Sequence, residues 1–422
     1  MSNPQLQVKS IKPFKFFGKL NAMTSKSFLQ RALALASLAN GASVLTNVHW
    51  SADGLAAADV IHQLGAEVQE EFRKLTITPS VSASKKDILL NIGESGLGLR
   101  MFSGLASLKN QAVTITGKGS ILERPIAAVM ETLSACDVEV YSKAGKLPIT
   151  ISGKLKGGNY TVDGSFSSQI LTGLLISLPL ADGDTKLHVK NLKSIPYIDM
   201  TLELVQLFGA EITHDDYKTF HIKGNQSYDG TSYAVEGDWS GMANHVVGAA
   251  ISGSATILGL NEHSIQADKA ILTALERTGA SVDWNNGSIT VKQVQNLPFE
   301  LDATHSPDIF PPLVVLACAA EGVSRITGIH RLMHKESDRL AALIETFGKL
   351  RVTLTTEGDT LLVHGTGSVS AGTIHSFNDH RIAMAGCIAA CISDGPIQIE
   401  KSDAVKKSYP LFFEELDEFL QE

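Results

Sequence analysis

A period of about 70 residues runs through the whole sequence. A small or polar cluster, followed by a mostly apolar run long enough to form a helix, occurs six times. An internal repeat of this length indicates one supersecondary unit copied along the chain, and six copies account for the 422 residues. The apolar runs begin near Lys26, Gly96, Ser168, Gly241, Asp308 and His380.

A second landmark gives the same period. Three helix-like stretches end in glycine followed by a strand-like stretch, at Gly65, Gly209 and Gly279, and weaker versions lie at Cys136 and Gly348. Glycine directly after a helix commonly adopts the left-handed conformation that closes the helix. Because helix starts and helix ends repeat at one spacing, the sequence predicts six units of similar structure.

The order of elements within a unit is an apolar helix, a short strand, a polar loop, an amphipathic helix and a strand. In the first unit the helices are expected at 28–38 and 55–64, and the strands at 43–48 and 66–70. The first helix is apolar on nearly every face, which predicts burial, whereas the second carries charges on one side and should lie outside. This pattern predicts an α/β repeat with buried helices, which a doubly wound sheet would not produce.

The loop-rich stretch 225–231 falls between the third and fourth units. It predicts two domains of three units each. Leu6-Gln7-Val8 reads as a possible strand in the arm before residue 20, and the pattern leaves its docking place open.

Composition limits the partners. The net charge is −8, and the sequence contains no block of basic residues. Both observations argue against nucleic acid as the main partner. The longest apolar run, 170–181, is too short to span a bilayer, and the basic stretch 8–17 lacks an apolar signal core. Three of the four cysteines lie in apolar runs without paired spacing, so we expect buried free thiols in a reducing cytoplasm.

Polar residues gather at the starts of the apolar helices and at the stretch 334–339. That stretch precedes an apolar stripe at 340, 343, 344 and 347, so it lies at a helix N-terminus, where free N–H groups favour anions. Ser337 is the candidate N-cap, and Lys335 and Arg339 should face the same way. A capped helix start with solvated charges would explain this stretch alone, but similar clusters recur along the chain.

These clusters suit anionic ligands. If the repeats are alike, each domain gathers three helix N-termini on one face, each equivalent to roughly half a positive charge. Two such faces opposed across a cleft would suit a polyanionic ligand pair and close on it. Asp308 and Glu336, with Lys26, could do acid–base work. The sequence has no tight metal-ligand cluster, and its glycine spacings fit neither a dinucleotide fingerprint nor a P-loop.

Taken jointly, these residues resemble the 5-enolpyruvylshikimate-3-phosphate (EPSP) synthase family of enolpyruvyl transferases over essentially the whole chain. Each motif alone would be weak evidence, but their order and spacing also match. The matching stretches are Ser25-Lys26-Ser27 with Arg31, Gly96, Arg100, Glu123-Arg124-Pro125, 164–169, Ser194 with Pro196-Tyr197-Ile198-Asp199, Glu236-Gly237-Asp238, Pro307-Asp308, Lys335 to Arg339, Asn378-Asp379-His380-Arg381, and Lys407.

The resemblance implies a two-domain α/β fold in which each domain holds three βαβαββ-type units with buried parallel helices. The N-terminal segment would join the second domain, which gives a first domain over 21–227 and a second over 1–20 plus 228–422. The implied reaction transfers the enolpyruvyl group of phosphoenolpyruvate to the 5-hydroxyl of shikimate 3-phosphate and releases phosphate, within chorismate and aromatic amino acid biosynthesis. We expect a cytoplasmic monomer that needs no cofactor.

The resemblance also assigns residues by position. Lys26, Asp308 and Glu336 would be catalytic: Asp308 would take the 5-hydroxyl proton, and Glu336 would handle the proton at the enolpyruvyl methylene, with Lys26 beside both. Shikimate 3-phosphate would be held by Lys26, Ser27, Arg31, Ser167, Ser168, Gln169, Ser194, Tyr197, Asp308, Arg331 and Lys335. Phosphoenolpyruvate would be held by Lys26, Gly96, Arg124, Gln169, Arg339, Arg381 and Lys407.

Three places in the first two units depart from the family pattern. Met23-Thr24 stands where Pro-Gly is usual, 51–54 is a reduced Ser-Asp-Asp-Thr-like stretch, and 93–97 replaces Gly-Asn-x-Gly-Thr. Glu94 thereby places a carboxylate near the phosphate of phosphoenolpyruvate, which is unfavourable unless the carboxylate is paired or turned away. These changes bear on phosphoenolpyruvate affinity and glyphosate response more than on the reaction class.

Two other functions stay open at this point. The departures are also compatible with a catalytically impaired homologue that binds anions. A sister enzyme that transfers enolpyruvate to UDP-N-acetylglucosamine shares the fold, but it typically has a reactive cysteine in a mobile loop, and no cysteine here occupies such a place. An assay of phosphate release with both substrates would discriminate among the three.

Overall fold

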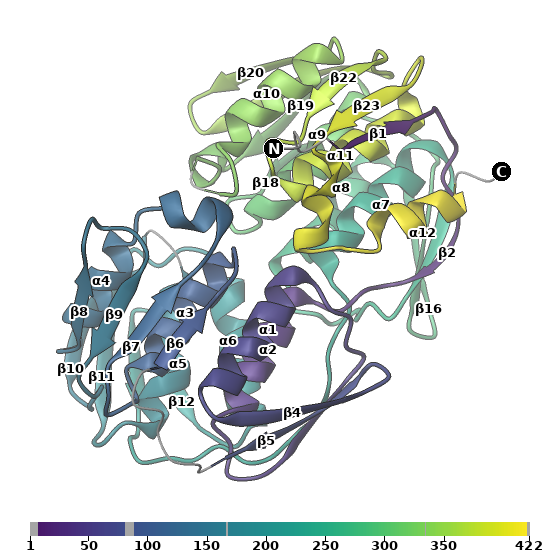
Figure 1. Cartoon of the computed structure of the whole chain (residues 1–422). Helices are drawn as coiled ribbons and strands as arrows, with labels where there is room; N and C mark the ends of the chain where they lie inside the picture. Colours follow the sequence, from purple (N-terminus) through teal and green to yellow (C-terminus); the bar gives the residue numbers. More distant parts are fainter. Residues whose placement is uncertain (1–6, 81–87, 166–167, 334, 420–422) are drawn as a thin grey trace, which may run out of the picture. The chain divides into compact units, whose positions relative to one another are not determined.

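The structure is a computed structural model that describes residues 7–80, 88–165, 168–333 and 335–419. It divides into two compact units. We call Thr24–Val235 the central unit, and the chain up to Met23 together with the chain from Glu236 onward the terminal unit. Figure 1 colours the chain from purple at its start to yellow at its end, so the terminal unit combines the darkest purple strands with green and yellow elements.

The central unit contains three repeats, each with two helices and the strands of one sheet. The first holds α1 (Lys26–Ala36), β3 (Ser43–Thr46), α2 (Ala52–Gln63), β4 (Ala66–Glu71) and β5 (Lys74–Pro79). The second holds β6 (Ile88–Asn91), α3 (Gly96–Ala106), β7 (Val113–Thr116), the 3₁₀ helix η1 (Gly119–Glu123), α4 (Ala127–Ser134), β8 (Glu139–Ser142) and β9 (Ile149–Ser152). The third holds β10 (Asn159–Asp163), α5 (Ser168–Ser177), η2 (Leu178–Leu180), β11 (Thr185–Lys190), α6 (Ile195–Leu207), β12 (Ile212–Asp215) and β13 (Thr219–Ile222), and β14 (Ser232–Ala234) follows.

The three sheets of the central unit share one topology. The second and third run β6-β7-β9-β8 and β10-β11-β13-β12, with the first pair of strands parallel and the others antiparallel. The first sheet runs β14-β3-β5-β4, and β14 pairs parallel with β3, with Ser232 opposite Val44. The strand that precedes the buried helix in the other repeats is therefore supplied to the first sheet from the end of the third repeat.

The terminal unit repeats the pattern with the help of the N-terminal arm. Its first repeat uses β2 (Phe17–Asn21), α7 (Trp239–Ser252), β15 (Ser254–Leu258), η3 (Ala267–Ala270), α8 (Ile271–Thr278), β16 (Ser281–Asn285) and β17 (Ser288–Lys292). The second uses β18 (Glu300–Asp302), η4 (Pro307–Ile309), α9 (Phe310–Cys318), β19 (Glu321–Thr327), η5 (Ile329–Arg331), α10 (Arg339–Lys349), β20 (Thr353–Glu357) and β21 (Thr360–Thr366). The third uses β1 (Val8–Ile11), β22 (Gly372–His375), α11 (His380–Ala389), η6 (Ala390–Ile392), β23 (Ile397–Glu400), η7 (Ser402–Lys407) and α12 (Phe412–Phe419).

The arm docks at two sheets. β2 adds in parallel to β15, in the sheet β16-β17-β15-β2, and β1 pairs antiparallel with β23, in the sheet β1-β23-β22. The strand expected near Leu6 to Val8 begins at Val8, and Leu6 lies outside the described residues. The remaining sheet, β18-β19-β21-β20, has the same order as those of the central unit.

The apolar first helix of each repeat is buried, as its sequence predicts. All nine residues of α9 are buried, and so are all ten residues of α11. In the central unit, α3 and α5 approach very closely, because a Cβ on Gly104 would lie 2.5 Å from the carbonyl carbon of Gly173. These helices form the interior of each unit, and the sheets lie outside them (Figure 1).

The predicted helix starts are confirmed to within two residues. The six helices begin at Lys26, Gly96, Ser168, Trp239, Phe310 and His380. In the first repeat, α1 and α2 each start two or three residues before the expected position, because Ser25 and Ser51 accept hydrogen bonds from the N–H groups of Phe28 and Gly54 and cap the helices.

The predicted helix ends are confirmed at the three glycines that gave the clearest pattern. Gly65, Gly209 and Gly279 have φ angles of +109°, +91° and +82°. The weaker prediction at Gly348 is wrong, since this residue lies inside α10 and Arg351, with a φ of +63°, takes the left-handed position instead.

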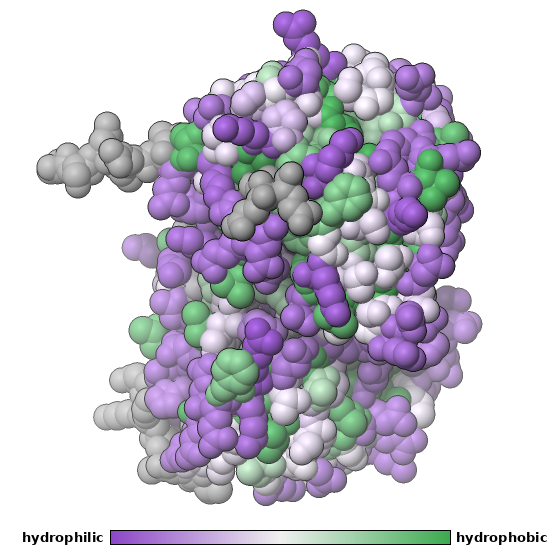
Figure 2. Space-filling model, turned by 90° about the vertical axis from the view of Figure 1, so that its right-hand side faces the viewer, coloured by the Kyte–Doolittle hydropathy of each residue, from purple (hydrophilic) through white to green (hydrophobic). Residues whose placement is uncertain are grey.

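The cysteines lie in the interior, and the face of the surface in Figure 2 is mixed in hydropathy. All four cysteines are buried and free. Within the described ranges, no helix is both long and apolar enough to cross a membrane. On the face shown in Figure 2, hydrophobic residues are scattered among hydrophilic ones, which is ordinary for a protein surface.

Candidate functional site

In the terminal unit, the starts of the three repeated helices meet. Arg381, in the first turn of α11, donates a hydrogen bond to the backbone carbonyl of Ser240 at the start of α7, over 3.4 Å. It also pairs with Asp308, in η4 just before α9, over 3.2 Å. These contacts bring three helix N-termini together in this unit, as the repeat pattern predicts.

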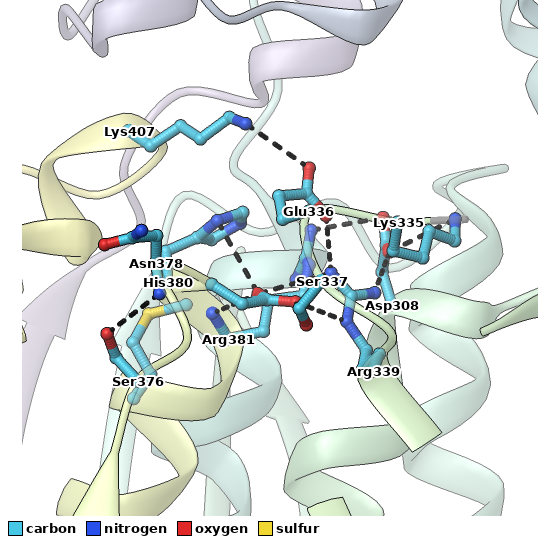
Figure 3. Close-up of polar contacts among 12 residues, drawn as sticks. Asp308, Lys335, Glu336, Ser337, Arg339, Ser376, Asn378, His380, Arg381 and Lys407 are labelled. Carbon is cyan, nitrogen blue, oxygen red and sulfur yellow. Dashed lines mark hydrogen bonds and ion pairs between the residues drawn. The ribbon is translucent and has the colours of Figure 1, made fainter. Parts of the chain in front are cut away.

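Arg339 is the centre of this cluster. Its guanidinium is fully buried and contacts three carboxylates: Asp308 at 2.7 Å, Glu336 at 2.7 Å and Asp379 at 2.9 Å. Asp379 is itself fully buried and caps α11 through the N–H of Arg381. The buried cation is therefore neutralised by side chains from three different places in the sequence, and Figure 3 shows two of them, Asp308 and Glu336, beside Arg339.

Asp308 collects cations. Besides Arg339 and Arg381, the Lys335 ammonium lies 3.5 Å from its carboxylate. Burial raises the pKa of Asp308, but the charges of Arg381, Lys335 and Arg339 outweigh burial and hold that pKa well below its usual value. Asp308 is consequently ionised at neutral pH.

The pKa values of Lys335 and Arg339 shift in opposite directions. Burial lowers the pKa of Lys335, and the charge of Asp308 only partly compensates. For Arg339, burial acts downward too, but the charges of Asp379, Asp308 and Glu336 raise the pKa further above its ordinary value. Lys335 thus remains the cation whose protonation is easier to change.

Glu336 lies between two cations. One of its oxygens accepts from Arg339, and the other is 3.7 Å from the Lys407 ammonium. The helix α10 begins at Arg339 with Asp338 as its N-cap, because the Asp338 carboxylate accepts from the N–H of Ala341. The prediction of Ser337 as N-cap is wrong: its hydroxyl donates to Asp379 instead, and so helps to hold the carboxylate that faces Arg339.

Further predictions in the terminal unit concern Lys335, Arg339 and Arg331. Lys335 and Arg339 do face the same carboxylate, as their spacing predicts. Arg331 ends the short helix η5 and is half-buried. His334 lies outside the described residues.

Sequence reasoning missed two carboxylates here. Asp379 was visible only as part of the Asn-Asp-His-Arg stretch, and its partner Arg339 is 40 residues away. Asp268 is buried and accepts a hydrogen bond from the Ser240 hydroxyl. Burial, together with the charge of Asp308, raises the pKa of Asp268 to about 6. For both Asp379 and Asp268, the only signal in the sequence was a polar residue at a helix start.

In the central unit, Lys26 begins α1, and its ammonium lies 3.0 Å from the carboxylate of Asp53 in the first turn of α2. The Asp53 side chain is 5% exposed and that of Lys26 is 17% exposed. Asp53 belongs to the stretch that departs from the family pattern, and sequence reasoning gave it no role. The structure makes it the ionic partner that fixes the Lys26 side chain.

Gly96, Arg124 and Gln169 also lie together. A Cβ on Gly96 would lie 3.1 Å from an Arg100 guanidinium nitrogen, 3.3 Å from one of Arg124, and 3.9 Å from the Gln169 side-chain oxygen. Arg100 donates to that oxygen over 2.7 Å. One terminal nitrogen of Arg124 is buried and finds no acceptor among the described residues. This cluster offers guanidinium donors at the N-terminus of α3, which suits an oxyanion.

Arg31 is buried completely within the central unit. Its guanidinium donates to the carbonyls of Ser27 and Tyr197 and to the hydroxyls of Thr172 and Thr201, at 2.8 to 3.3 Å. Burial lowers the pKa of Arg31 to about 10. These contacts join α1 to α5 and α6, and the threonine partners were not predicted.

Further predicted residues of the central unit lie at the starts of α5 and α6. Ser168 is buried at the first position of α5, and Ser167 lies outside the described residues. Ser194 precedes α6 in the left-handed conformation with a φ of +56°, which is uncommon for a residue other than glycine and is concentrated at functional sites. Tyr197, in the first turn of α6, is half-buried.

Within the described residues, no three His, Cys, Asp or Glu side chains gather as a metal site requires.

Comparisons with known proteins identify relatives over nearly the whole chain. A family model described as EPSP synthase (3-phosphoshikimate 1-carboxyvinyltransferase) matches residues 11–416. A 3-phosphoshikimate 1-carboxyvinyltransferase of Clostridium kluyveri is 35% identical over 407 residues, which cover 96% of each chain. One from Methanococcus vannielii is 33% identical and covers 94% of this chain and 95% of the relative.

Solved structures are also similar to this chain over nearly its whole length. The EPSP synthase of Acinetobacter baumannii has a TM-score of 0.83 and 25% identity, covering 98% of both chains. The enolpyruvyl transferase NikO from Streptomyces tendae has a TM-score of 0.79 at 16% identity, covering 98% of this chain and 97% of that one, and supports the fold alone.

Proposed function

Because this chain belongs to the EPSP synthase (3-phosphoshikimate 1-carboxyvinyltransferase) family, we propose that it transfers the enolpyruvyl group of phosphoenolpyruvate to the 5-hydroxyl of shikimate 3-phosphate. Phosphate is released, and the product serves chorismate and aromatic amino acid biosynthesis. The observation that carries the proposal is the cluster around Arg339. In this cluster Asp308 and Glu336, two carboxylates suited to proton transfer, both contact the Arg339 guanidinium.

The reaction requires two proton transfers at carbon and one at oxygen. The 5-hydroxyl oxygen forms a bond to the substituted vinyl carbon as the methylene carbon gains a proton. The methylene carbon then loses a proton as the bond to phosphate breaks. We assign Asp308 to the hydroxyl proton and Glu336 to the methylene proton, with Lys26 as an ammonium that supports them, and each is a residue type used for general acid–base catalysis.

The same cations serve the carboxylate of phosphoenolpyruvate in this proposal. Arg339, Arg381 and Lys407 now contact Asp308 and Glu336. A substrate carboxylate that takes some of these donors would weaken their hold on Asp308, and the pKa of Asp308 would rise from its depressed value toward its ordinary one. Substrate binding would thereby turn a weakly basic carboxylate into a better general base.

In the central unit, we assign the phosphate of phosphoenolpyruvate to Gly96, Arg124, Gln169 and Lys26. One buried terminal nitrogen of Arg124, which has no hydrogen-bond acceptor in the described part of the chain, supports this assignment. We assign shikimate 3-phosphate mainly to the α1, α5 and α6 starts, with Arg31 fixing the backbone of Ser27 and Tyr197. The division into a domain over 21–227 that binds shikimate 3-phosphate, and one over 1–20 plus 228–422 that carries the two carboxylates, is part of the proposal.

The test is phosphate release with both substrates present, together with detection of the enolpyruvyl product by mass spectrometry. Neither substrate alone should release phosphate. UDP-N-acetylglucosamine in place of shikimate 3-phosphate should give no product. A chain that binds both anions without releasing phosphate would instead be the impaired homologue. Light scattering tests the accompanying proposal that the enzyme is a monomer, and fractionation of its source cells tests the proposal that it is cytoplasmic.

A further inference from the structure

The loop that carries Arg124 is tied to the loop that carries Gly96. The Glu94 carboxylate, two residues before Gly96, accepts hydrogen bonds from the backbone N–H of Ser120 at 3.3 Å and from its hydroxyl at 3.2 Å. Ser120 is the second residue of η1, and Arg124 follows the end of that short helix. A single side chain thus connects the two loops that meet at Gly96.

The local backbone is shaped to allow this contact. Gly119 has a φ of +61°, and a Cβ there would overlap the Glu94 carboxyl group. Only glycine combines that conformation with so close an approach. The backbone N–H of Lys118 also donates to the carbonyl of Gly93 over 2.8 Å. The two loops therefore meet along a short seam, with Glu94 as its side-chain contact.

The turn that carries Glu94 is held by its neighbour Ser95. Ser95 caps α3 through the N–H of Gly98 and donates its hydroxyl to Gln30, so the turn is anchored without Glu94. The half-buried Glu94 side chain points instead toward η1. The Glu94 carboxylate is therefore turned toward η1, where it accepts from two neutral donors of Ser120.

We propose that Glu94 is a positioning residue that holds η1 in place and so sets Arg124 over Gly96 for the phosphate of phosphoenolpyruvate. The inference rests on the proposed function for the identity of the bound anion. Without Glu94, Ser120 loses its acceptor, the 118–124 loop gains freedom, and the Arg124 guanidinium must be ordered at the moment of binding. The ordering cost appears in substrate affinity and leaves the acid–base groups of the terminal unit intact.

The kinetic test compares Glu94→Ala with Glu94→Gln. Gln keeps an oxygen that accepts from Ser120 but removes the charge. We expect Glu94→Ala to raise the KM for phosphoenolpyruvate by about tenfold, with kcat within about twofold and the KM for shikimate 3-phosphate unchanged. Glu94→Gln should restore most of the loss. Glu131→Gln, an exposed carboxylate on α4, removes the same charge without touching Ser120 and should behave as the wild type.

A double-mutant cycle isolates the contact. Ser120→Ala removes the hydroxyl donor but keeps the backbone one, so its effect on KM should be about two- to threefold. Combined with Glu94→Ala, it should add nothing further, because the acceptor is already gone. Fully additive effects would mean that the two residues act separately and would overturn the proposal. A Glu94→Ala enzyme that binds phosphoenolpyruvate as tightly as wild type, or more tightly, would overturn it as well.

Amide hydrogen exchange separates this inference from the proposed function. In the wild type, the Ser120 N–H is hydrogen-bonded to Glu94. Peptides spanning 118–125 should exchange faster in Glu94→Ala and near the wild-type rate in Glu94→Gln, whether or not the enzyme turns over these substrates. Unchanged exchange in Glu94→Ala would refute the tie between the loops. An inactive wild type with the expected exchange pattern would refute only the function.

Discussion

Arg339 gains its position from three carboxylates at once, and this sharing shapes what each partner can do. Asp379 is fully buried and keeps its contact with Arg339 through two donors, Nε and Nη2. Asp308 and Glu336 retain partial exposure, at 22% and 17% of their side chains. The buried carboxylate therefore serves to hold the cation, whereas the two partly exposed ones are available to a substrate.

Glu336→Gln should cut turnover by about 100-fold or more, the usual scale for a positioned proton donor or acceptor. Gln keeps the shape and still accepts from Arg339, but it cannot take up a proton. Lys26→Met should have an effect of the same size. Steady-state phosphate release measures both, and circular dichroism should show that the fold is retained. Glu345→Gln, an exposed carboxylate on α10, is the control. Near-normal turnover of Glu336→Gln would remove the role assigned to it.

Asp268→Asn should change stability in a pH-dependent way. The pKa of Asp268 is raised from 3.8 to about 6, so between these values the native state holds more protons than the unfolded state. Stability therefore falls as pH rises through this range. Asn cannot ionise, and the variant should gain on the wild type as pH rises.

Urea denaturation between about pH 4 and about pH 7 measures this gap in unfolding free energy. The advantage of Asp268→Asn should be largest above pH 6 and should close toward pH 4. Asp283→Asn, which removes an exposed carboxylate that also accepts from a serine hydroxyl, controls for the lost charge. A gap that widens at low pH would contradict the assignment.

At the residue scale, the sequence pointed to polar side chains at helix starts, but it did not indicate partners that lie far along the chain. Asp308 and Glu336 were found in this way, and the contacts show them sharing Arg339. Thr172 and Thr201, which hold Arg31, read as ordinary helix residues, and only the packing of α5 and α6 around α1 shows their task.

At the scale of elements, the buried helices depend on glycine at their closest approach. Gly104 of α3 and Gly173 of α5 meet backbone to backbone. Such packing lets two helices pass without side chains between them, and it leaves no space for a methyl group.

Gly104→Ala should destabilise the protein by about 2 kcal/mol or more, because the new Cβ must push α3 and α5 apart. Gly348→Ala in α10 is the matched control: a Cβ there meets nothing within 4 Å. That change should be stabilising by about 0.5–1 kcal/mol through helix propensity. Thermal or urea unfolding measures both, and equal effects of the two substitutions would refute the close-packing argument.

The periodic pattern predicted the elements well, because each repeat must bury one apolar helix under one sheet. The helix starts and the glycine caps follow from local chemistry. The pairing of β14 with β3 does not, since it joins Ser232 to Val44 across the whole central unit and no local signal specifies it.

At the scale of the whole molecule, the proposed substrate contacts are distributed over both units. Most of the contacts proposed for shikimate 3-phosphate lie in the central unit. This ligand should therefore slow amide exchange most strongly in α1 and α6, where Ser27 and Tyr197 lie. Exchange measured peptide by peptide, with and without the ligand, checks this. Phosphate alone serves as the control for simple anion binding. Protection confined to residues 236–422 would reverse the proposed assignment of the domains.

Turnover should be unaffected by EDTA. The proposed chemistry uses side-chain ammonium, guanidinium and carboxylate groups, so removal of divalent ions should leave the rate of phosphate release unchanged. A loss of activity that one divalent ion restores would show that a metal takes part in the reaction.

The docking of β1 and β2 determines the order in which the protein can assemble during synthesis. β2 pairs with β15, and β1 pairs with β23, which spans residues 397–400 and is made long after β1. At 5–20 residues per second, β1 waits roughly 20–80 s for its partner. The central unit, by contrast, has every strand of its three sheets once Ala234 has been added. The central unit can therefore fold while β1 is still unpaired, so the nascent protein carries an exposed β-strand edge until β23 has been made.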